Sequence, residues 1–189
     1  MKTFIAATAV ALSLAACQTI SEDSCRAGDW ESIGYDAGAR GKSRGYLGDI
    51  SEGCSAYSIR PDRTLFLRGY DAGLRTYCTP DRGRNRGLSG RAPHDVCTSD
   101  TFPAYASAFD AGVAQYRLEA EYASLIDQYN AADLELTEVT LRLADELLPD
   151  ADRRLFRQER VRLVSELEAL RLDIRAMQQA HALPVWDPA

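Results

Sequence analysis

The sequence has little of what most catalytic and metal sites need. Its 189 residues include two histidines, His94 and His181, and five cysteines, none of them in a C-x-x-C pair. Structural zinc sites take paired ligands a few residues apart, so the sequence predicts no metal site. No Ser/His/Asp or Cys/His set is recognisable, so we expect no catalytic residue and no enzyme.

The sequence also lacks a nucleotide-binding loop and a membrane-spanning run. A P-loop places Gly-Lys-Ser/Thr at the start of a helix after a strand, and a dinucleotide loop reads G-x-G-x-x-G. The glycine-rich segments fit neither pattern, so we expect no cofactor. The apolar run at residues 4–14 is too short to cross a bilayer as a helix.

Residues 1–16 are instead typical of a lipoprotein signal peptide. Lys2 precedes the apolar run, and Leu-Ala-Ala-Cys at residues 14–17 has the pattern of a bacterial lipobox. In a lipobox the signal is cut before the cysteine, whose thiol then carries a diacylglycerol. We therefore expect Cys17 to be lipidated; the alternative is an ordinary cleavable signal with an incidental cysteine.

The expected location in the cell envelope limits the possible partners of the protein. Gln18 stands where enterobacterial lipoproteins retained at the inner membrane carry aspartate, so we expect the periplasmic face of the outer membrane. Residues 17–27 are predicted to be the lipidated cysteine and a polar tether. One expected partner is the membrane, through the lipid anchor. Nucleic acid is not expected, because an exported protein meets little of it.

The other four cysteines, Cys25, Cys54, Cys78 and Cys97, are expected to form disulfides, because the periplasm is oxidising. Four cysteines permit three connectivities. The internal repeat favours Cys25–Cys54 with Cys78–Cys97, since each bond would then close one repeat unit.

Composition divides the chain near residue 100. Twelve of the thirteen glycines lie between residues 28 and 90, whereas the later part alternates Leu, Ala, Glu and Arg as long helices do. We therefore expect a Gly/Cys-rich repeat module over residues 28–100, a helical hairpin over residues 101–182 and a tail over residues 183–189.

Charge divides in the same way. Residues 40–91 hold eleven basic and five acidic side chains, and residues 101–150 hold two basic and ten acidic ones. Residues 151–182 hold seven basic and five acidic side chains. The acidic first arm of the expected hairpin therefore complements the arginine-bearing second arm.

A five-residue motif repeats in the first part. Gly-Tyr-Asp-Ala-Gly at residues 34–38 recurs at residues 69–73, and more weakly as Ala-Phe-Asp-Ala-Gly at residues 108–112. Its two glycines are one helical turn apart and share a face. Because such a stripe costs helix propensity, we expect it to serve the close packing of a neighbouring helix.

The aspartate of this motif is not expected to be catalytic. Asp36 has Arg40 four residues on, and Asp71 has Arg75 at the same spacing. Pairs at this spacing stabilise a helix by a few tenths of a kcal/mol. We therefore expect two surface ion pairs.

A second repeat is basic. The pattern Arg-Gly-x-x-Arg-Gly-x-x-Gly occurs at residues 40–48 and, with Asn at its fourth position, at residues 82–90. We expect loops in which glycine permits turns, either merely solvated or binding an anion such as a phospholipid head group, a lipopolysaccharide phosphate or a peptidoglycan carboxylate. The candidate anion-binding residues are Arg40, Lys42, Arg44, Arg82, Arg84 and Arg86.

The order of these residues carries a resemblance. The order resembles the one seen in a family of uncharacterised proteobacterial lipoproteins. It runs from Cys25, Trp30 and the first glycine motif to Cys54, then to the second glycine motif with Tyr77-Cys78, and finally to Cys97. That family is known only as a domain of unknown function. The resemblance covers about residues 25–97; it implies an exported, lipidated protein and carries no activity.

The later part predicts an antiparallel coiled-coil hairpin, which makes the chain all-α. Phe102-Pro103 suits a helix start, the pattern runs to about Leu147, and Asp150 can cap a second helix after Pro149. Trp186 is expected to pack back on the hairpin, and His181 to be half-exposed at the end of its stripe. The stripes are Leu118, Tyr122, Leu125, Tyr129, Ala132, Leu136, Val139 and Leu143, and Phe156, Arg160, Leu163, Leu167, Leu170, Ile174, Met177 and His181.

Together these features favour a non-enzymatic envelope lipoprotein, a scaffold or accessory protein whose hairpin binds another envelope protein. A binding module for peptidoglycan or lipopolysaccharide anions is the alternative, and an enzyme is the least favoured class.

The lipobox makes a direct prediction. Metabolic labelling with palmitate should mark the wild-type protein, because a lipidated Cys17 carries acyl chains, and stable anchoring takes more than one. Cys17→Ser should stay unlabelled, because it lacks the thiol that is modified. An unlabelled wild-type protein would contradict the interpretation of residues 14–17.

Overall fold

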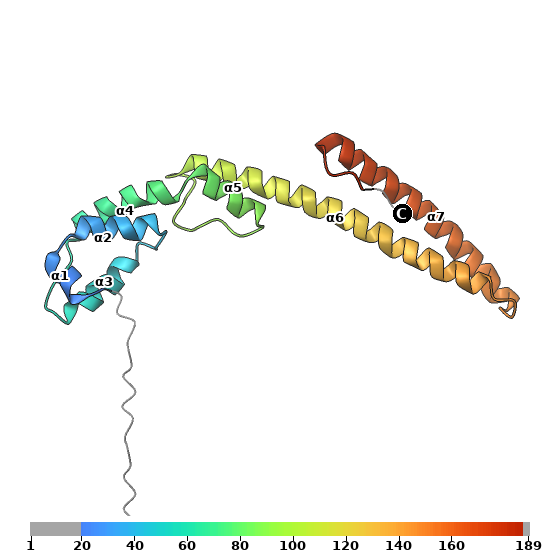
Figure 1. Cartoon of the computed structure of the whole chain (residues 1–189), viewed down its shortest axis with the longest axis horizontal. Coiled ribbons are helices and arrows are strands. Elements are labelled where there is room, and N and C mark those ends of the chain that lie inside the picture. Colours follow the sequence, from blue (N-terminus) through green and yellow to red (C-terminus); the bar gives the residue numbers. More distant parts are fainter. Residues whose placement is uncertain (1–19, 187–189) are drawn as a thin grey trace, which may run out of the picture. The chain divides into compact units, whose positions relative to one another are not determined.

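The computed structural model of the chain describes residues 20–186, and within them every regular element is an α-helix (Figure 1). The predicted all-α class and the two disulfides are therefore confirmed. None of the helices in this range is long and apolar enough to cross a membrane. Residues 1–16 and Cys17 lie outside the described residues. The helices are α1 (Glu22–Ala27), α2 (Trp30–Ala39), α3 (Tyr46–Ser55), α4 (Arg63–Tyr77), α5 (Pro80–Leu88), α6 (Pro103–Leu143) and α7 (Asp150–His181).

The described chain forms two compact units. The first contains residues 20–86 and 91–110, and the second contains residues 87–90 and 111–186. The first unit thus extends ten residues past the expected boundary at residue 100. The reason is apolar burial: Tyr105 is fully buried in the first core, and Phe102 and Phe109 pack against that core.

Helices α2 and α4 pack through the repeated glycines. A Cβ atom on Gly34 would overlap the carbonyl oxygen of Phe66, and one on Gly69 would overlap that of Glu31. The second glycine of each motif meets the partner backbone in the same way, Gly38 at Tyr70 and Gly73 at Tyr35. Residue numbers rise together along both helices, so the helices run parallel. The contact is reciprocal, each copy of the motif presenting its glycines to the backbone of the other.

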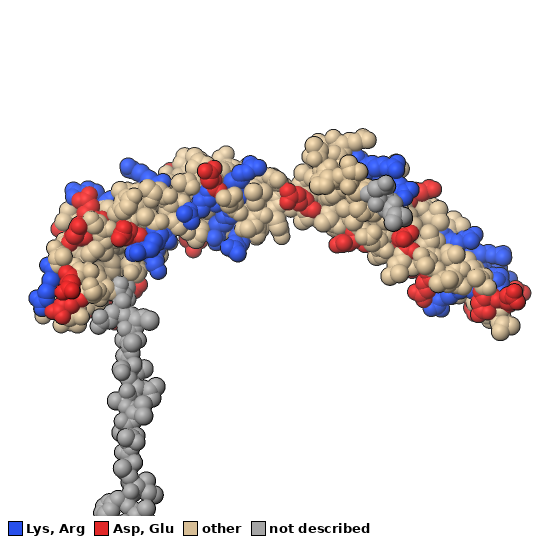
Figure 2. Space-filling view, viewed as in Figure 1, with Lys and Arg blue, Asp and Glu red and all other residues tan. Residues whose placement is uncertain are grey.

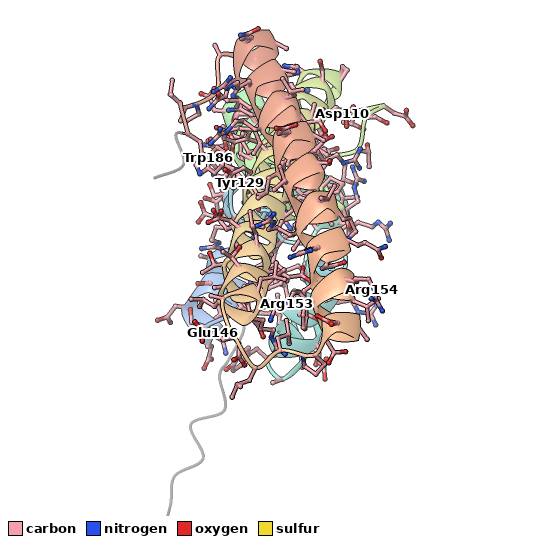
Figure 3. All side chains as sticks on the ribbon, turned by 90° about the vertical axis from the view of Figure 1, so that its right-hand side faces the viewer. Asp110, Tyr129, Glu146, Arg153, Arg154 and Trp186 are labelled. Atoms are coloured by element: carbon pink, nitrogen blue, oxygen red, sulfur yellow. A yellow bond between two sulfur atoms is a disulfide. The ribbon has the colours of Figure 1, made fainter. Side chains whose placement is uncertain are left out.

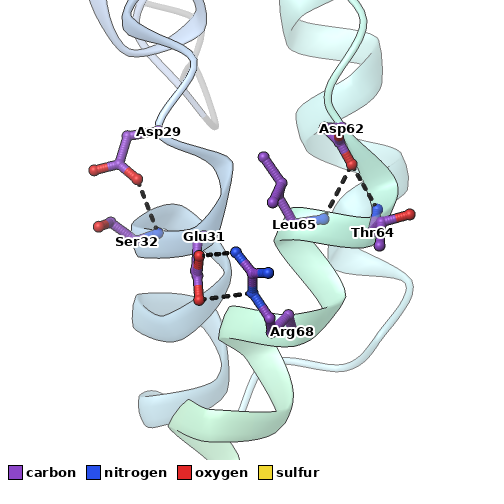
Figure 4. Close-up of polar contacts among 7 residues, drawn as sticks. All are labelled: Asp29, Glu31, Ser32, Asp62, Thr64, Leu65 and Arg68. Atoms are coloured by element: carbon purple, nitrogen blue, oxygen red, sulfur yellow. Dashed lines mark hydrogen bonds and ion pairs between the residues drawn. The ribbon is translucent and has the colours of Figure 1, made fainter.

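The starts of the two helices are also alike (Figure 4). Asp29 accepts a hydrogen bond from the backbone N–H of Ser32, and Asp62 accepts from those of Thr64 and Leu65. Each aspartate is the N-cap of its helix. An N-cap side chain satisfies backbone donors that the helix leaves unpaired, so both copies begin their helix by the same device.

One ion pair joins the two helices beside the glycines. The guanidinium of Arg68 on α4 donates to both carboxylate oxygens of Glu31 on α2 (Figure 4). The pair lowers the pKa of Glu31, mainly through the hydrogen bond from Arg68. Because both side chains are exposed, water screens the pair and the buried glycine contact contributes more to stability.

The disulfides join Cys25 to Cys54 and Cys78 to Cys97, the connectivity that the repeat favoured. The first bond links α1 to α3, and Cys25 is buried. The predicted polar tether is therefore wrong for residues 22–27, which form a helix capped by Ser21. The second bond fixes the segment after α5 to the C-terminal end of α4.

The second basic repeat is a helix rather than the predicted loop. Residues 82–88 belong to α5, where the Thr79 hydroxyl accepts a hydrogen bond from the Arg82 N–H. Gly83 lies where a side chain would overlap the Tyr105 carbonyl oxygen, so this glycine serves packing. The expectation of turns holds at Gly41 and Gly90, whose φ angles are +68° and +66°.

In the second unit α7 runs back along α6. The cross-helix contacts join Tyr122 to Gln178, Tyr129 to Arg171 and Glu135 to Arg162. As the α6 number rises the α7 number falls by a similar amount, so the helices are antiparallel. The buried residues of their shared core are Tyr122, Tyr129, Ala132, Val139, Leu163, Leu167, Leu170 and Ile174, all of them members of the predicted stripes.

Arg153 closes the turn between these helices. Its guanidinium donates to the backbone carbonyl oxygens of Leu143, Asp145 and Leu148. These carbonyls have no helical partner because α6 ends at Leu143, four residues earlier than predicted. Pro149 occupies the N-cap position of α7, and Asp150 is the first helical residue rather than the cap.

The described tail folds back as predicted. Trp186 meets the Tyr129 ring edge to face, with 4.7 Å between the ring centroids (Figure 3). The Tyr122 hydroxyl donates a 2.7 Å hydrogen bond to the Pro184 carbonyl oxygen. His181, expected to be half-exposed, is exposed at the last position of α7, which ends at Ala182 in the left-handed conformation.

The glycine contact can be tested by adding one methyl group. Gly34→Ala should lower the free energy of unfolding by about 2–3 kcal/mol, because α2 and α4 must separate to admit the Cβ atom. Gly48→Ala in α3 is the matched control, since a Cβ there meets no atom within 4 Å. It should be neutral or stabilising by up to about 1 kcal/mol. Urea unfolding followed by circular dichroism measures both, and equal stability of the two variants would contradict the packing described.

Candidate functional site

The predicted anion-binding residues come from two elements. Arg40, Lys42 and Arg44 follow α2, whereas Arg82, Arg84 and Arg86 lie on α5. On the face shown in Figure 2, basic and acidic side chains are interspersed over α1–α4 rather than gathered by sign. The sequence repeat therefore does not by itself define one basic patch.

Several of these side chains already contact protein groups. Arg44 donates a 2.5 Å hydrogen bond to Asp71, so the predicted partner of Asp71, Arg75, is wrong. The Lys42 ammonium lies 5.3 Å from the centre of the Tyr46 ring. The chain turns after α2 and brings Arg44 close to Asp71. The spacing of the two residues in the sequence does not reveal this contact.

Two arginines of α5, Arg82 and Arg86, lie near His94. The Arg82 guanidinium stacks over the Tyr77 ring at 4.2 Å, and Arg86 donates to the Ala92 carbonyl oxygen. Arg86 also lies 2.9 Å from Nε2 of His94, and the Tyr77 hydroxyl lies 2.8 Å from the same nitrogen. Arg82 and Arg86 thus contribute to the structure of the first unit.

The protonation state of His94 follows from this geometry. A guanidinium can only donate hydrogen bonds, so Nε2 must accept and the imidazole is neutral. Burial lowers the pKa of His94, and the positive charges of Arg86 and Arg82 lower it further. A proton on Nε2 would face the Arg86 guanidinium and break that contact, whereas the Tyr77 hydroxyl could accept from the protonated nitrogen.

The first unit also contains a cleft of about 780 Å³. One wall is a face of α4, and the opposite wall is the segment between α5 and α6. Of the six predicted anion-binding residues only Arg44 lines it. The other polar residues of the cleft were missed by the sequence reasoning, because they lie far apart along the chain and share no motif. The lining is Ser43, Arg44, Tyr70, Asp71, Leu74, Arg75, Asp95, Val96, Thr98, Thr101 and Phe102.

The α6–α7 pair has two unlike sides. On one side Arg162 forms ion pairs with Glu159, Glu166 and, across the helices, Glu135. These pairs raise the pKa of Arg162 and lower that of Glu159, chiefly through the hydrogen bond between them. The charged side therefore satisfies its own charges.

The other side exposes apolar side chains beside polar ones. A groove of about 470 Å³ runs between the helices and is lined by Leu136, Thr140, Arg160, Val161, Val164 and Ser165. The predicted core position Arg160 is exposed at this groove. In this lining Val161 is 65% exposed, and Leu172, further along α7, is 66% exposed. On α6, Leu134 and Leu141 are 73% and 69% exposed and two turns apart.

Comparison with known proteins identifies one domain. A family described as a protein of unknown function (DUF2799) matches residues 29–114. The matched domain therefore includes the glycine motifs, the cleft and the start of α6. No curated protein and no solved structure gives a significant match to the chain.

The described residues offer little for metal binding. Over residues 20–186 no three side chains of the His, Cys, Asp or Glu type come close enough to hold a metal ion. The four cysteines of this range are joined in disulfides, so their sulfurs are not available as thiolate ligands. The chemistry available at the cleft is thus hydrogen bonding, charge pairing and apolar contact.

His94 predicts a pH dependence of stability. Its pKa is lower in the folded chain than the value of about 6.5 expected when unfolded, so the unfolded chain binds the proton first. Stability should be complete above pH 6.5 or so and fall as the pH drops through that value, until the folded form is protonated too. Thermal unfolding between pH 7.5 and 5 should show this loss in the wild-type protein.

Two histidine variants provide the control. His94→Gln should lose the part of the pH dependence centred near 6.5, whereas His181→Gln should keep it because His181 is exposed. If both variants follow the wild-type profile, His94 is not the titrating group.

Proposed function

We propose that the chain is a lipid-anchored protein of the bacterial envelope, without catalytic activity, that binds another envelope protein through the α6–α7 pair. In this proposal Cys17 carries the lipid, the disulfide-linked repeat module stands near the membrane, and the pair is an antiparallel coiled-coil hairpin. The resemblance to proteobacterial lipoproteins and the lipobox support the lipid anchor and the location in the envelope. The α6–α7 pair supports the mode of binding.

The observation that carries the proposal is the difference between the two sides of this pair. One side pairs its own charges around Arg162, whereas the groove on the other side exposes Val161 and Val164 to water. Exposed apolar side chains arranged around a groove are typical of a protein-binding surface. An amphipathic helix laid into such a groove would bury them.

The groove also indicates the chemistry of the partner. Arg160 lines it beside Val161 and Val164. A partner helix that suits the groove therefore carries an apolar stripe with an acidic side chain at its edge. Since α7 has 32 residues, the surface can extend over about 48 Å, long enough for a helix of many turns.

Anion binding by the basic repeats is less well supported. Arg44 contacts Asp71, Arg82 contacts Tyr77, and Arg86 contacts Ala92 and His94. An anion would have to displace or share these contacts. A surface that is already satisfied gains less from a new ligand than one whose apolar groups face water.

Site-specific photo-crosslinking in cells tests the proposal. A photoreactive residue at Val161 or Val164, two exposed residues that line the groove, should yield one adduct of defined size. The same residue at Glu166, which pairs with Arg162 outside the groove, is the matched control and should yield none. Equal adducts from both sides, or none from either, would contradict the proposal, and an adduct of twice the chain mass would identify self-association instead.

The partner identified in this way should then be purified. Val161→Glu should weaken its binding about tenfold or more, because a charge would replace an apolar residue of the groove. Its helix content should match the wild type, since Val161 is exposed in the free protein.

A further inference from the structure

We propose that the cleft of the first unit binds a small zwitterionic ligand, an amino acid or short peptide, with its carboxylate at Arg75 and its ammonium at Asp95. This site is separate from the surface of the α6–α7 pair. Its volume of about 780 Å³ lies within the range of small-molecule sites.

The charges of the cleft decide between ligand classes. The lining contains two cations, Arg44 and Arg75, and two carboxylates, Asp71 and Asp95. A ligand with only negative charge would be repelled by the two carboxylates. A ligand with only positive charge would be repelled by the two arginines. A ligand that carries both signs is the one that avoids like-charge repulsion.

The pairing within the cleft shows which groups remain for a ligand. Asp71 is taken up by Arg44, at 2.5 Å. Within the described residues neither Arg75 nor Asp95 takes part in an ion pair, although the Asp95 charge acts on the neighbouring His94. Arg75 is therefore the free carboxylate binder, with a fork of donors that suits a carboxylate, and Asp95 is the free acceptor for an ammonium.

The other lining residues suit a peptide. Leu74, Val96 and Phe102 supply apolar contact for a side chain, and the hydroxyls of Ser43 and Thr98 supply hydrogen bonds. Small-ligand sites commonly combine an apolar lining with a few placed polar groups in this way.

The fold holds the two charges on separate but fixed supports. Arg75 lies on α4, and Asp95 lies in the segment between α5 and α6. The Cys78–Cys97 disulfide ties that segment to the end of α4, two residues from Asp95 and three from Arg75 along the chain. The two walls of the cleft are thus covalently joined beside the proposed site, which limits the ordering cost of binding.

Calorimetric titration of the purified chain with the dipeptide Ala-Ala tests the assignment. The wild type should bind it saturably, and blocking either end, by N-acetylation or by C-terminal amidation, should weaken binding about tenfold or more because each removes a charge-assisted contact. Absence of saturable binding of the free dipeptide, or equal binding of the N-acetylated form, would overturn the proposal.

Variants assign the two ends. Arg75→Gln should bind Ala-Ala about tenfold more weakly and no longer distinguish the free acid from the amide. Asp95→Asn should no longer distinguish the free amine from the acetylated form. Arg63→Gln and Asp100→Asn, exposed residues outside the lining, are the matched controls and should behave as the wild type.

If Arg75 had only a structural role, Arg75→Gln would bind more weakly but would still prefer the free acid to the amide. An Arg75→Gln variant that still prefers the free acid would therefore overturn the assignment even if its affinity fell. Val161→Glu should leave dipeptide binding unchanged, so that this proposal and the partner-binding proposal fail separately.

Discussion

The backbone contact between α2 and α4 is the constraint on which the first unit depends. Four glycines, Gly34, Gly38, Gly69 and Gly73, bring two helices so close that a single Cβ atom on any of them would overlap a carbonyl oxygen. Glycine costs up to about 1 kcal/mol in a helix interior, so four of them are retained only where close packing returns more. The reciprocal contact lets two copies of one short motif form the centre of a small domain.

The remaining parts of this unit are arranged around that contact. Phe66 and Tyr70 are fully buried beside the glycines, and the two disulfides attach α1 with α3 and the segment after α5. A small domain buries a limited apolar area, so covalent links supply part of its stability. The second disulfide also positions a wall of the cleft, because Cys97 stands in the sequence between Val96 and Thr98, and both of these line the cleft.

The second unit solves a different problem. Two helices alone can bury only one stripe each, and here the stripes form a core from Tyr122 to Ile174. One outer side completes its own charge pairs around Arg162, while the other leaves leucine and valine exposed. The tail covers one part of the pair through Trp186 and Tyr129, and the groove near Val161 remains open. In the function proposed here, a partner helix buries that surface.

The sequence by itself determined the all-α class, the glycine faces, the two disulfides and the core stripes of α6 and α7, because periodicity and spacing act locally along a helix. It did not determine that residues 82–88 are helical, since their glycines suggest a loop until Gly83 is seen against Tyr105. It paired Asp71 with Arg75, four residues away, where the tertiary structure pairs it with Arg44. The cleft and the apolar groove were likewise decided only by tertiary structure, because each collects residues from segments that the sequence keeps apart.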